Sequence, residues 1–245
     1  MGMKGKVAII TGGGTGIGRS TSLSLSRRGA IVVINYSRSK EEAEETLREI
    51  VSQGGRGIVY KADVADDQAV RGMIKDVAGQ YGQLDILVNN AGVTDFVAYS
   101  NLEGLTDEIW DRAFGVNVKG TFYCCRAAAP YLKERRGCIV NTASIAGVTG
   151  QGSSMAYAAT KAAIISLTKS LARALAPEIR VNSVSPGIVL TRWVAGQESH
   201  IDRLSRGTPL GRPCNPEDVA EVTLGLIENA GMVTGQNIII DGGII

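Results

Sequence analysis

Residues Lys6–Ser20 read KVAIITGGGTGIGRS, and this stretch decides the fold class. The apolar run Val7–Ile10 has the length and the β-branched content of a buried strand. A glycine-rich turn follows Thr11 and leads into a helix that we expect to begin near Ile17. Such a strand–turn–helix unit directs the first amides of the helix at a phosphate group. The stretch therefore predicts a phosphate-binding turn at the end of the first strand.

The spacing of the glycines distinguishes between the known kinds of phosphate-binding turn. It does not fit G-x-G-x-x-G, the common dinucleotide-binding pattern. The pattern that fits is Thr-Gly-x-x-x-Gly-x-Gly, on Thr11, Gly12, Gly16 and Gly18. A nucleoside triphosphate loop is a rival interpretation, because residues 13–20 match G-x-x-x-x-G-[K/R]-S, but Arg19 replaces its lysine and we find no aspartate placed to hold its metal. A glycine-rich turn without a ligand is the other alternative.

Six further runs rich in Val and Ile follow. They are Ile31–Ile34, Gly57–Tyr60, Asp85–Val88, Cys138–Val140, Arg180–Val184 and Asn237–Ile240. The runs are continuous rather than alternating, as in strands buried on both faces of a parallel sheet. Segments with helical spacing, such as Lys40–Gln53, separate the first six, so the pattern predicts a doubly wound α/β fold with helices on both faces. We expect a single domain over residues 1–245, with a substrate lid at about 188–212.

Composition excludes several function classes. The 26 basic and 24 acidic residues nearly cancel, which disfavours nucleic acid as a partner. No apolar run approaches 18 residues and MGMKGKVAII lacks secretory features, so we expect neither a membrane span nor a signal peptide. His200 is the one histidine and GxSxG is absent, which disfavours a Ser-His-Asp hydrolase and a histidine-rich metal site. The four cysteines form no CxxC pair, so we expect free thiols, a cytoplasmic location and no metal.

The end of the second predicted strand bears on the type of cofactor. NAD enzymes usually place an acid there for the ribose 2′-hydroxyl, but no Asp or Glu occurs from Ile34 through Ser39. Arg38, helped by the Ser37 hydroxyl, is placed to pair with a 2′-phosphate instead. A solvated loop arginine is the alternative. We therefore expect NADP(H) to be preferred over NAD(H).

Two asparagines follow the fourth predicted strand. The segment Leu84–Gly92 reads LDILVNNAG, so Asn89 and Asn90 come at the strand's carboxyl end. Their side chains bond readily to neighbouring backbone groups and so shape a turn. Ligands of open α/β sheets bind at this edge, although a plain turn is the alternative.

Tyr157 and Lys161 share one face of a helix predicted over Ser154–Ala176, because they are four residues apart. A phenol titrates near 10, and a cation within about 4–6 Å favours the phenolate. Such a tyrosine becomes an acid/base near neutral pH. Tyr-x-x-x-Lys occurs by chance on many helices, so its weight comes from the other motifs.

Six motifs occur in one order along the chain: TGGGTGIG, NNAG, Asn117 in VNVKG, Ser144 in NTASIAG, YAATK and Pro186-Gly187. Their order and spacing resemble those of the short-chain dehydrogenase/reductase family, from Lys6 to the end of the chain. The resemblance implies a Rossmann-type fold with a seven-stranded parallel sheet, a nicotinamide cofactor and a homotetramer. Within the family, the chain is most similar to 3-oxoacyl-[acyl carrier protein] reductases and to glucose 1-dehydrogenase-like members.

The resemblance also implies a role for each matching position. Tyr157 is the acid/base, Lys161 its partner, Ser144 the holder of the carbonyl oxygen and Asn117 the fourth catalytic residue. The cofactor contacts that it implies, together with those argued above, are Gly12, Thr15, Gly16, Ile17, Gly18, Ser37, Arg38, Asp63, Val64, Asn90, Ala91, Gly92, Tyr157, Lys161, Pro186, Gly187, Ile188 and Thr191. The expected reaction is NADPH-dependent reduction of a ketone to a secondary alcohol.

The apolar residues of the lid and of the facing loop bear on the substrate. They are Phe96, Val97, Tyr99, Met155, Val189, Leu190, Trp193, Val194, Ile201 and Leu204. An apolar pocket suits a 3-oxoacyl thioester or similar β-keto substrate better than a sugar, whose hydroxyls need partners. Packing of the lid, a sugar or polyol dehydrogenase, and a non-catalytic cofactor-binding regulator are the alternatives. His200 is expected on the lid surface.

Acyl carrier protein is left open as a partner. The family's reductases dock it with basic residues beside the active-site mouth, where we expect Arg135 and Arg136, but Glu134 dilutes this charge. The loop that follows Gly92 also departs from the pattern of those reductases.

Overall fold

The computed structural model describes residues 2–194 and 207–245, and the predicted fold class is confirmed. Within these residues, seven parallel strands form one sheet in the order β3-β2-β1-β4-β5-β6-β7. The strands are β1 Val7–Thr11, β2 Ile31–Tyr36, β3 Arg56–Lys61, β4 Ile86–Asn89, β5 Cys138–Thr142, β6 Arg180–Pro186 and β7 Asn237–Ile240. Each coincides, within two residues at either end, with one of the predicted Val- and Ile-rich runs.

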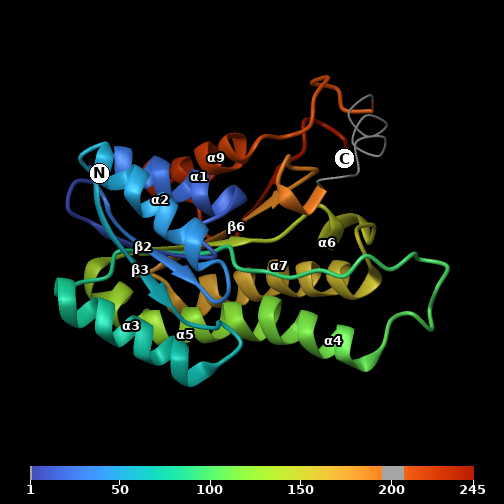
Figure 1. Ribbon diagram of the computed structural model, residues 1–245, viewed down its shortest axis with the longest axis horizontal. Helices are drawn as coiled ribbons and strands as arrows, with labels where there is room; N and C mark the ends of the chain where they lie inside the picture. The colour runs from blue at the N-terminus through green and yellow to red at the C-terminus, as the bar shows by residue number, and fades with distance from the viewer. Residues whose placement is uncertain (1, 195–206) are drawn as a thin grey trace.

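Helices cover both faces of the sheet (Figure 1). On one face lie α1 (Gly16–Arg27), α2 (Lys40–Ser52) and α9 (Pro216–Glu228). On the other lie α3 (Asp67–Tyr81), α5 (Thr121–Arg135) and α7 (Met155–Leu175). The sheet is therefore the middle of three layers.

Neighbouring residues of one strand belong to different cores. In β1, Ile10 packs into the core under α1, α2 and α9, whereas Ile9 packs into the core with α3, α5 and α7. Both side chains are completely buried. Because both faces are covered, every position of such a strand favours an apolar residue, and this produces the continuous runs seen in the sequence.

The parallel register brings the carboxyl ends of the strands together. Thr11 of β1 pairs with Asn35 of β2, and Asn89 of β4 pairs with Asn141 of β5. The segments that leave this edge include α6 (Ala146–Thr149) and the short 3₁₀ turn η2 (Arg192–Val194). In open α/β sheets this edge is where ligands bind.

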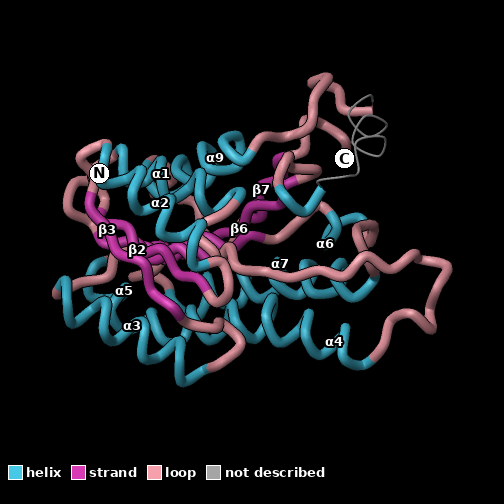
Figure 2. Tube along the Cα trace, viewed as in Figure 1, coloured by secondary structure: helices cyan, strands magenta, loops and turns pink. Residues whose placement is uncertain are grey.

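Two features near this edge were not predicted. The helix α4 (Asp107–Ala113) passes through a π-helical turn, η1 (Phe114–Gly120), into α5, and π-turns are frequent at functional sites. The long loop between β4 and α4 passes beside α7 (Figure 2). In the segment that leads into α7, Ser153 O accepts from Val97 N over 3.0 Å and Gly150 O accepts from Tyr99 Oη over 2.7 Å.

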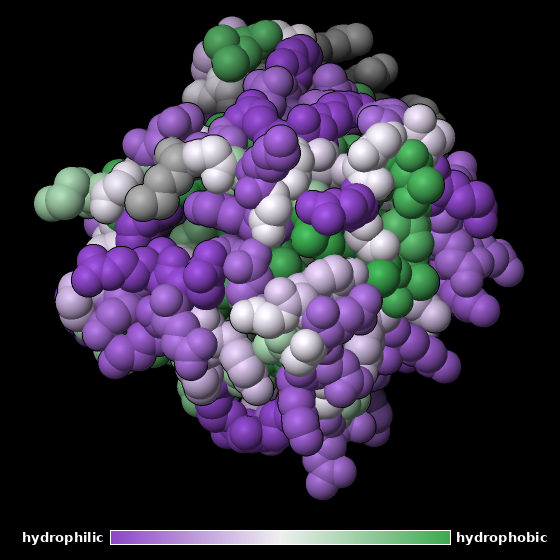
Figure 3. Space-filling view, turned by 90° about the vertical axis from the view of Figure 1, so that its left-hand side faces the viewer, coloured by the Kyte–Doolittle hydropathy of each residue, from purple (hydrophilic) through white to green (hydrophobic). Residues whose placement is uncertain are grey.

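One side of the molecule shows how polar and apolar residues are distributed on part of the surface. The side of the molecule seen in Figure 3 is covered mainly by hydrophilic residues. No helix in residues 2–194 or 207–245 combines the length and the apolar character needed to span a membrane.

Candidate active site

The glycine-rich turn has a conformation that requires glycine. Gly12 and Gly16 have φ angles of 61° and 50°, in the left-handed region. A Cβ on Gly18 would lie 2.2 Å from the carbonyl oxygen of Gly12, which no side chain tolerates. These glycines therefore form a tight cradle rather than a loose loop.

The amino end of α1 opens onto this cradle. Thr15 stands at the N-cap position but makes no side-chain hydrogen bond to the helix amides, and the first turn carries no acid. Uncapped amides and the helix dipole together favour an anion. The cradle and this helix end fit the diphosphate of a dinucleotide, and Ile17 packs its side chain against the core beneath them.

Thr11 and Asn90 join β1 to the turn after β4. Thr11 Oγ1 accepts hydrogen bonds from the backbone nitrogens of Asn90 and Ala91, over 2.9 and 3.0 Å. Asn90 Nδ2 donates to the carbonyls of Thr11 and Gly12, over 3.1 and 3.2 Å. Asn89 instead points inward and donates to Asn141 Oδ1 over 2.9 Å. Of the two asparagines, only Asn90 shapes the cradle.

Lys161 lies buried below the edge of the sheet. Its Nζ donates to the carbonyl oxygen of Thr142, at the end of β5, over 2.7 Å. Burial lowers the pKa of this ammonium from 10.5 to about 8. Gly92 lies beside it, since a Cβ at that position would lie in ordinary contact with Nζ, at 3.8 Å.

Tyr157 stands one turn before Lys161 on α7, with the ammonium Nζ 5.5 Å from the centre of its ring. Burial raises the pKa of the phenol to about 12, and a hydrogen bond with Ser144 acts in the opposite direction. The structure thus brings Tyr157, Ser144 and Lys161 together, as the sequence indicates. The predicted lowering of the tyrosine pKa by Lys161 is not found in this arrangement, because burial of the phenol dominates.

Asn117 is fully buried in the π-turn and links three segments. Its Nδ2 donates to Val93 O and to Thr160 Oγ1, each over 3.0 Å, and its Oδ1 accepts from Val93 N over 2.8 Å. Its own carbonyl accepts from the Thr121 hydroxyl over 2.7 Å. In this structure the side chain fastens the loop after β4 to α7.

The segment that follows β6 crosses the carboxyl edge of the sheet. Its Thr191 lies against the glycine-rich turn, since a Cβ on Gly16 would meet Thr191 Cγ2 at 3.1 Å. The ring of Trp193 stands edge-on to that of Tyr157, with centroids 6.3 Å apart and planes at 73°. Residues 191–193 therefore touch both the phosphate cradle and the tyrosine.

The remaining predicted cofactor contacts lie along the same edge. Ser37 and Arg38 are exposed after β2, and Arg38 makes no ion pair with any residue in the described ranges. Asp63 is exposed after β3, while Val64 is buried and would meet a Cβ on Gly120 at 2.9 Å. After β6, Pro186 is buried and Gly187 N donates to Ile240 O over 2.8 Å.

Sequence reasoning missed the contacts made by residues 191–193. Trp193 approaches Tyr157, and Arg192 approaches the loop after β2. No local spacing in the sequence predicts either contact. Ile188 follows β6, and its carbonyl accepts from Cys214 N over 2.9 Å. His200, Ile201 and Leu204 lie outside the described residues.

The apolar residues predicted to line the substrate pocket divide into two groups. Val189 is buried, whereas Phe96, Leu190 and Trp193 keep 58%, 42% and 39% of their surface exposed. Of these exposed side chains, Trp193 stands against Tyr157, so apolar surface does lie open beside the tyrosine.

The expected position of Arg135 is wrong. The residue lies at the end of α5, where its Nε contacts Asp85 Oδ1 over 3.3 Å. Asp85 precedes β4, so the pair lies at the amino edge of the sheet, opposite the tyrosine. Arg136 is the C-cap of the same helix.

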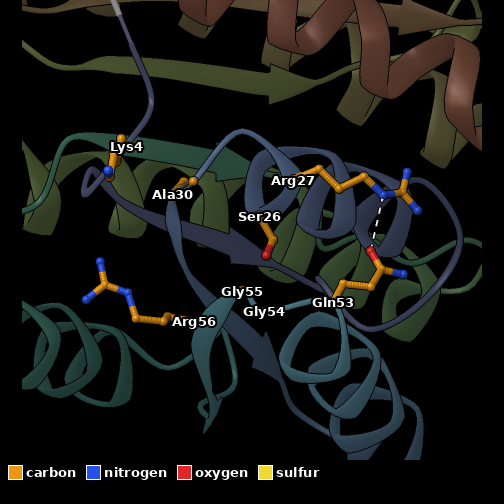
Figure 4. A pocket seen from close by; sticks show the side chains of 9 residues that line it. Lys4, Ser26, Arg27, Ala30, Gln53, Gly54, Gly55 and Arg56 are labelled. Atoms are coloured by element: carbon orange, nitrogen blue, oxygen red, sulfur yellow. Dashed lines mark hydrogen bonds between the residues drawn. The ribbon is translucent and has the colours of Figure 1, made fainter.

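A cavity of about 310 Å³ also lies at the amino edge (Figure 4). It is lined by residues that include Lys4, Arg27 and Arg56. The three basic side chains point apart rather than toward a common centre. This cavity does not belong to the site around Tyr157.

Known proteins resemble this chain over nearly its whole length. A family described as enoyl-(acyl carrier protein) reductase matches residues 12–245. A 3-oxoacyl-[acyl-carrier-protein] reductase FabG of Staphylococcus aureus is 39% identical over 97% of this chain and 97% of its own. A short-chain dehydrogenase of Burkholderia cenocepacia, solved in complex with NADP, is 36% identical, with a TM-score of 0.92 over 100% of this chain and 99% of its own.

Proposed function

The chain belongs to the short-chain dehydrogenase/reductase family, and from this premise we propose that it reduces a ketone to a secondary alcohol with NADPH. Membership makes it an oxidoreductase that acts on CH–OH groups. The observation that carries the finer proposal is the grouping of Ser144, Tyr157 and Lys161 beside the glycine-rich cradle.

The residues at the carboxyl edge fit a nicotinamide dinucleotide phosphate. The cradle of Gly12, Gly16 and Gly18 leaves the amino end of α1 open to a diphosphate. Arg38 is exposed and has no carboxylate partner among the described residues, which suits a 2′-phosphate. When bound, the cofactor supplies a hydride to the carbonyl carbon.

The chain's own residues then supply position, a proton and charge. Tyr157 Oη donates its proton to the carbonyl oxygen, and the Ser144 hydroxyl hydrogen-bonds to the same oxygen. The protonated Lys161 stabilises the negative charge that Tyr157 acquires. Positioned proton transfer typically contributes about 10²–10⁴-fold.

Asn117 positions the backbone around the site. Its side chain fastens the loop after β4 to α7 through Val93 and Thr160. Because Thr160 directly precedes Lys161, this link helps to hold the helix turn that carries Lys161 in place. We propose that its π-turn also orders a water that relays protons to Lys161. The π-turn at this point supports the proposal, because such turns are frequent at functional sites.

The substrate that we propose is a 3-oxoacyl thioester or a similar β-keto compound. The exposed apolar side chains of Phe96, Leu190 and Trp193 suit an acyl chain better than a sugar. Several relatives carry the name 3-oxoacyl-[acyl-carrier-protein] reductase. The position of Arg135 away from the site gives no support to acyl carrier protein docking through that residue.

A paired assay tests the substrate. The loss of NADPH absorbance with acetoacetyl-CoA is compared with the gain of NADPH from NADP⁺ and glucose, at equal enzyme concentration. We expect activity with the thioester. Activity with glucose alone would replace the proposal with a sugar dehydrogenase. Cofactor binding without turnover on a panel of ketones would point to a non-catalytic regulator.

A further inference from the structure

Arg192 brings a second guanidinium to the loop after β2. Its Nη1 and Nη2 atoms lie 3.3 and 3.2 Å from Ser39 Oγ, and Nη1 lies 3.1 Å from Glu42 Oε1. Ser39 follows Arg38 directly and is the N-cap of α2. The contact joins positions 153 residues apart in the chain, so it depends on the fold and not on a local motif.

Ser39 lacks the hydrogen bond that a serine at its position commonly makes. Ser at an N-cap usually accepts a hydrogen bond from the first helix amides. Here Ser39 makes no such bond, and its hydroxyl accepts from Arg192 instead. The amino end of α2 therefore lacks this side-chain cap, and it carries Glu41 and Glu42 in its first turn, so the positive charge beside it comes from the two arginines and not from the helix end.

We propose that Arg192 reads the 2′-phosphate of NADP(H) together with Arg38, and that Glu42 holds its guanidinium in place until the phosphate takes it over. This assignment rests on the proposed use of NADPH. A guanidinium pairs with a phosphate through two parallel hydrogen bonds, as it does with a carboxylate. NADH has no group that replaces Glu42 in this way.

Replacing Glu42 by the 2′-phosphate as the partner of Arg192 also affects the two residues next to Arg192. Thr191 lies on the glycine-rich turn and Trp193 stands against Tyr157. The three residues are consecutive, so the position of Arg192 constrains the position of the indole beside the tyrosine. Recognition of the 2′-phosphate therefore helps to place the apolar wall of the substrate site.

The charges around Glu42 fix the sign of each substitution. Arg192→Ala removes a phosphate partner and weakens NADPH binding. Glu42→Gln removes a carboxylate that competes for Arg192 and repels the phosphate, so it strengthens NADPH binding. NADH carries a 2′-hydroxyl in place of the phosphate, so neither substitution should change its affinity. A residue with a merely structural role would change the affinity for both nucleotides equally.

The test measures dissociation constants of the full chain for NADPH and NADH by titration calorimetry. For Arg192→Ala we expect NADPH to bind roughly 10-fold more weakly and NADH to bind with little change. Glu42→Gln should tighten NADPH binding, and Arg192→Lys should fall between Arg192→Ala and the unmodified chain. Arg71→Ala and Asp67→Asn are the matched controls, because they break a similar exposed ion pair on α3.

The outcomes separate this assignment from the proposed function. An unchanged NADPH constant in Arg192→Ala, or equal weakening of both nucleotides, would overturn the assignment alone. Weaker NADPH binding in Glu42→Gln would also overturn it. If the unmodified chain bound neither nucleotide, the proposed function would fall and the assignment with it.

Discussion

The ammonium of Lys161 lies 5.5 Å from the centre of the Tyr157 ring and donates to the carbonyl of Thr142, not to the phenol. Burial shifts the pKa of each group toward its neutral form, to about 8 for Lys161 and about 12 for Tyr157. Near pH 7 the tyrosine therefore keeps its proton and the lysine keeps its charge. This is the protonation state that proton donation to a ketone requires.

Replacement of Tyr157 by Phe should lower the turnover number for ketone reduction by at least about 100-fold, because the proton donor is lost. The dissociation constant for NADPH should change little. Steady-state kinetics and calorimetry measure the two quantities. Tyr60→Phe is the control, since that hydroxyl bonds to Asp76 on the surface. Unchanged turnover in Tyr157→Phe would remove the tyrosine from the mechanism.

Replacement of Lys161 by Met should change how stability depends on pH. The pKa of Lys161 is about 8 in the folded chain and 10.5 as the ordinary value, so between these values the unfolded chain binds more protons. The free energy of unfolding of the unmodified chain should therefore rise with pH from about 8 to 10.5, relative to the Lys161→Met variant. Urea unfolding at several pH values checks this. Lys169→Met, an exposed lysine of α7, is the control, and parallel curves for Lys161→Met would contradict the expectation.

Ketone reduction should slow as the pH rises above about 8. Lys161 loses its positive charge in this range, and the charge that develops on Tyr157 is then no longer stabilised. Initial rates at saturating NADPH, between pH 6.5 and 9.5, measure the effect. A rate that stays flat through pH 9 would show that the charge of Lys161 does not contribute.

NADPH should bind roughly 10- to 100-fold more tightly than NADH, because a charge-assisted pair with Arg38 is worth about 1.5–3 kcal/mol. Arg38→Ala should remove most of the difference. The dissociation constants of the unmodified chain and of Arg38→Ala, for NADPH and for NADH, test this prediction. Arg27→Ala, at the opposite edge of the sheet, controls for the loss of one positive charge. Equal constants in the unmodified chain would contradict the preference.

Replacement of Gly18 by Ala should abolish NADPH binding and destabilise the fold, because the new Cβ would lie 2.2 Å from the Gly12 carbonyl. Gly72→Ala in α3 is the matched control. No atom lies within 4 Å of a Cβ at that helical position, so this change should stabilise the chain by about 0.5–1 kcal/mol. Thermal unfolding and nucleotide titration compare the two variants. Tolerance of Gly18→Ala would show that the turn is looser than the structure indicates.

A tetramer is expected from the family resemblance, with a mass of four times 25.8 kDa by light scattering. Ile245 is 50% exposed in the single chain. The resemblance to the family implies that the C-terminal residues 241–245 pack against a second copy across one two-fold axis of the tetramer, and this contact would cover Ile245. Ile245→Asp should therefore lower the assembled mass to that of a dimer. Met232→Asp is the control, because Met232 is 98% exposed on a loop. A monomer mass for the unmodified chain would reject the assembly.

Local sequence patterns were enough to predict the layers of this protein and the order of its strands along the chain. Strands buried on two faces need apolar residues at every position, so the seven runs could be recognised without knowing their neighbours. The spacing from Tyr157 to Lys161 placed them on one helix face, because helix geometry is local. The glycines of the turn were equally visible, since Gly12 and Gly16 adopt positive φ angles that other residues avoid.

The tertiary structure decided which distant residues meet and how their charges behave. The sequence predicts a cation beside Tyr157, but the depth of burial, which no local pattern encodes, raises the tyrosine pKa instead of lowering it. The contact of Arg192 with Glu42 exists only because the segment after β6 crosses the carboxyl edge of the sheet. Arg135 likewise lies at the amino edge because α5 runs the full depth of the sheet. Local spacing determines which residues share one face of a helix or strand, whereas long-range packing determines which residues that face contacts.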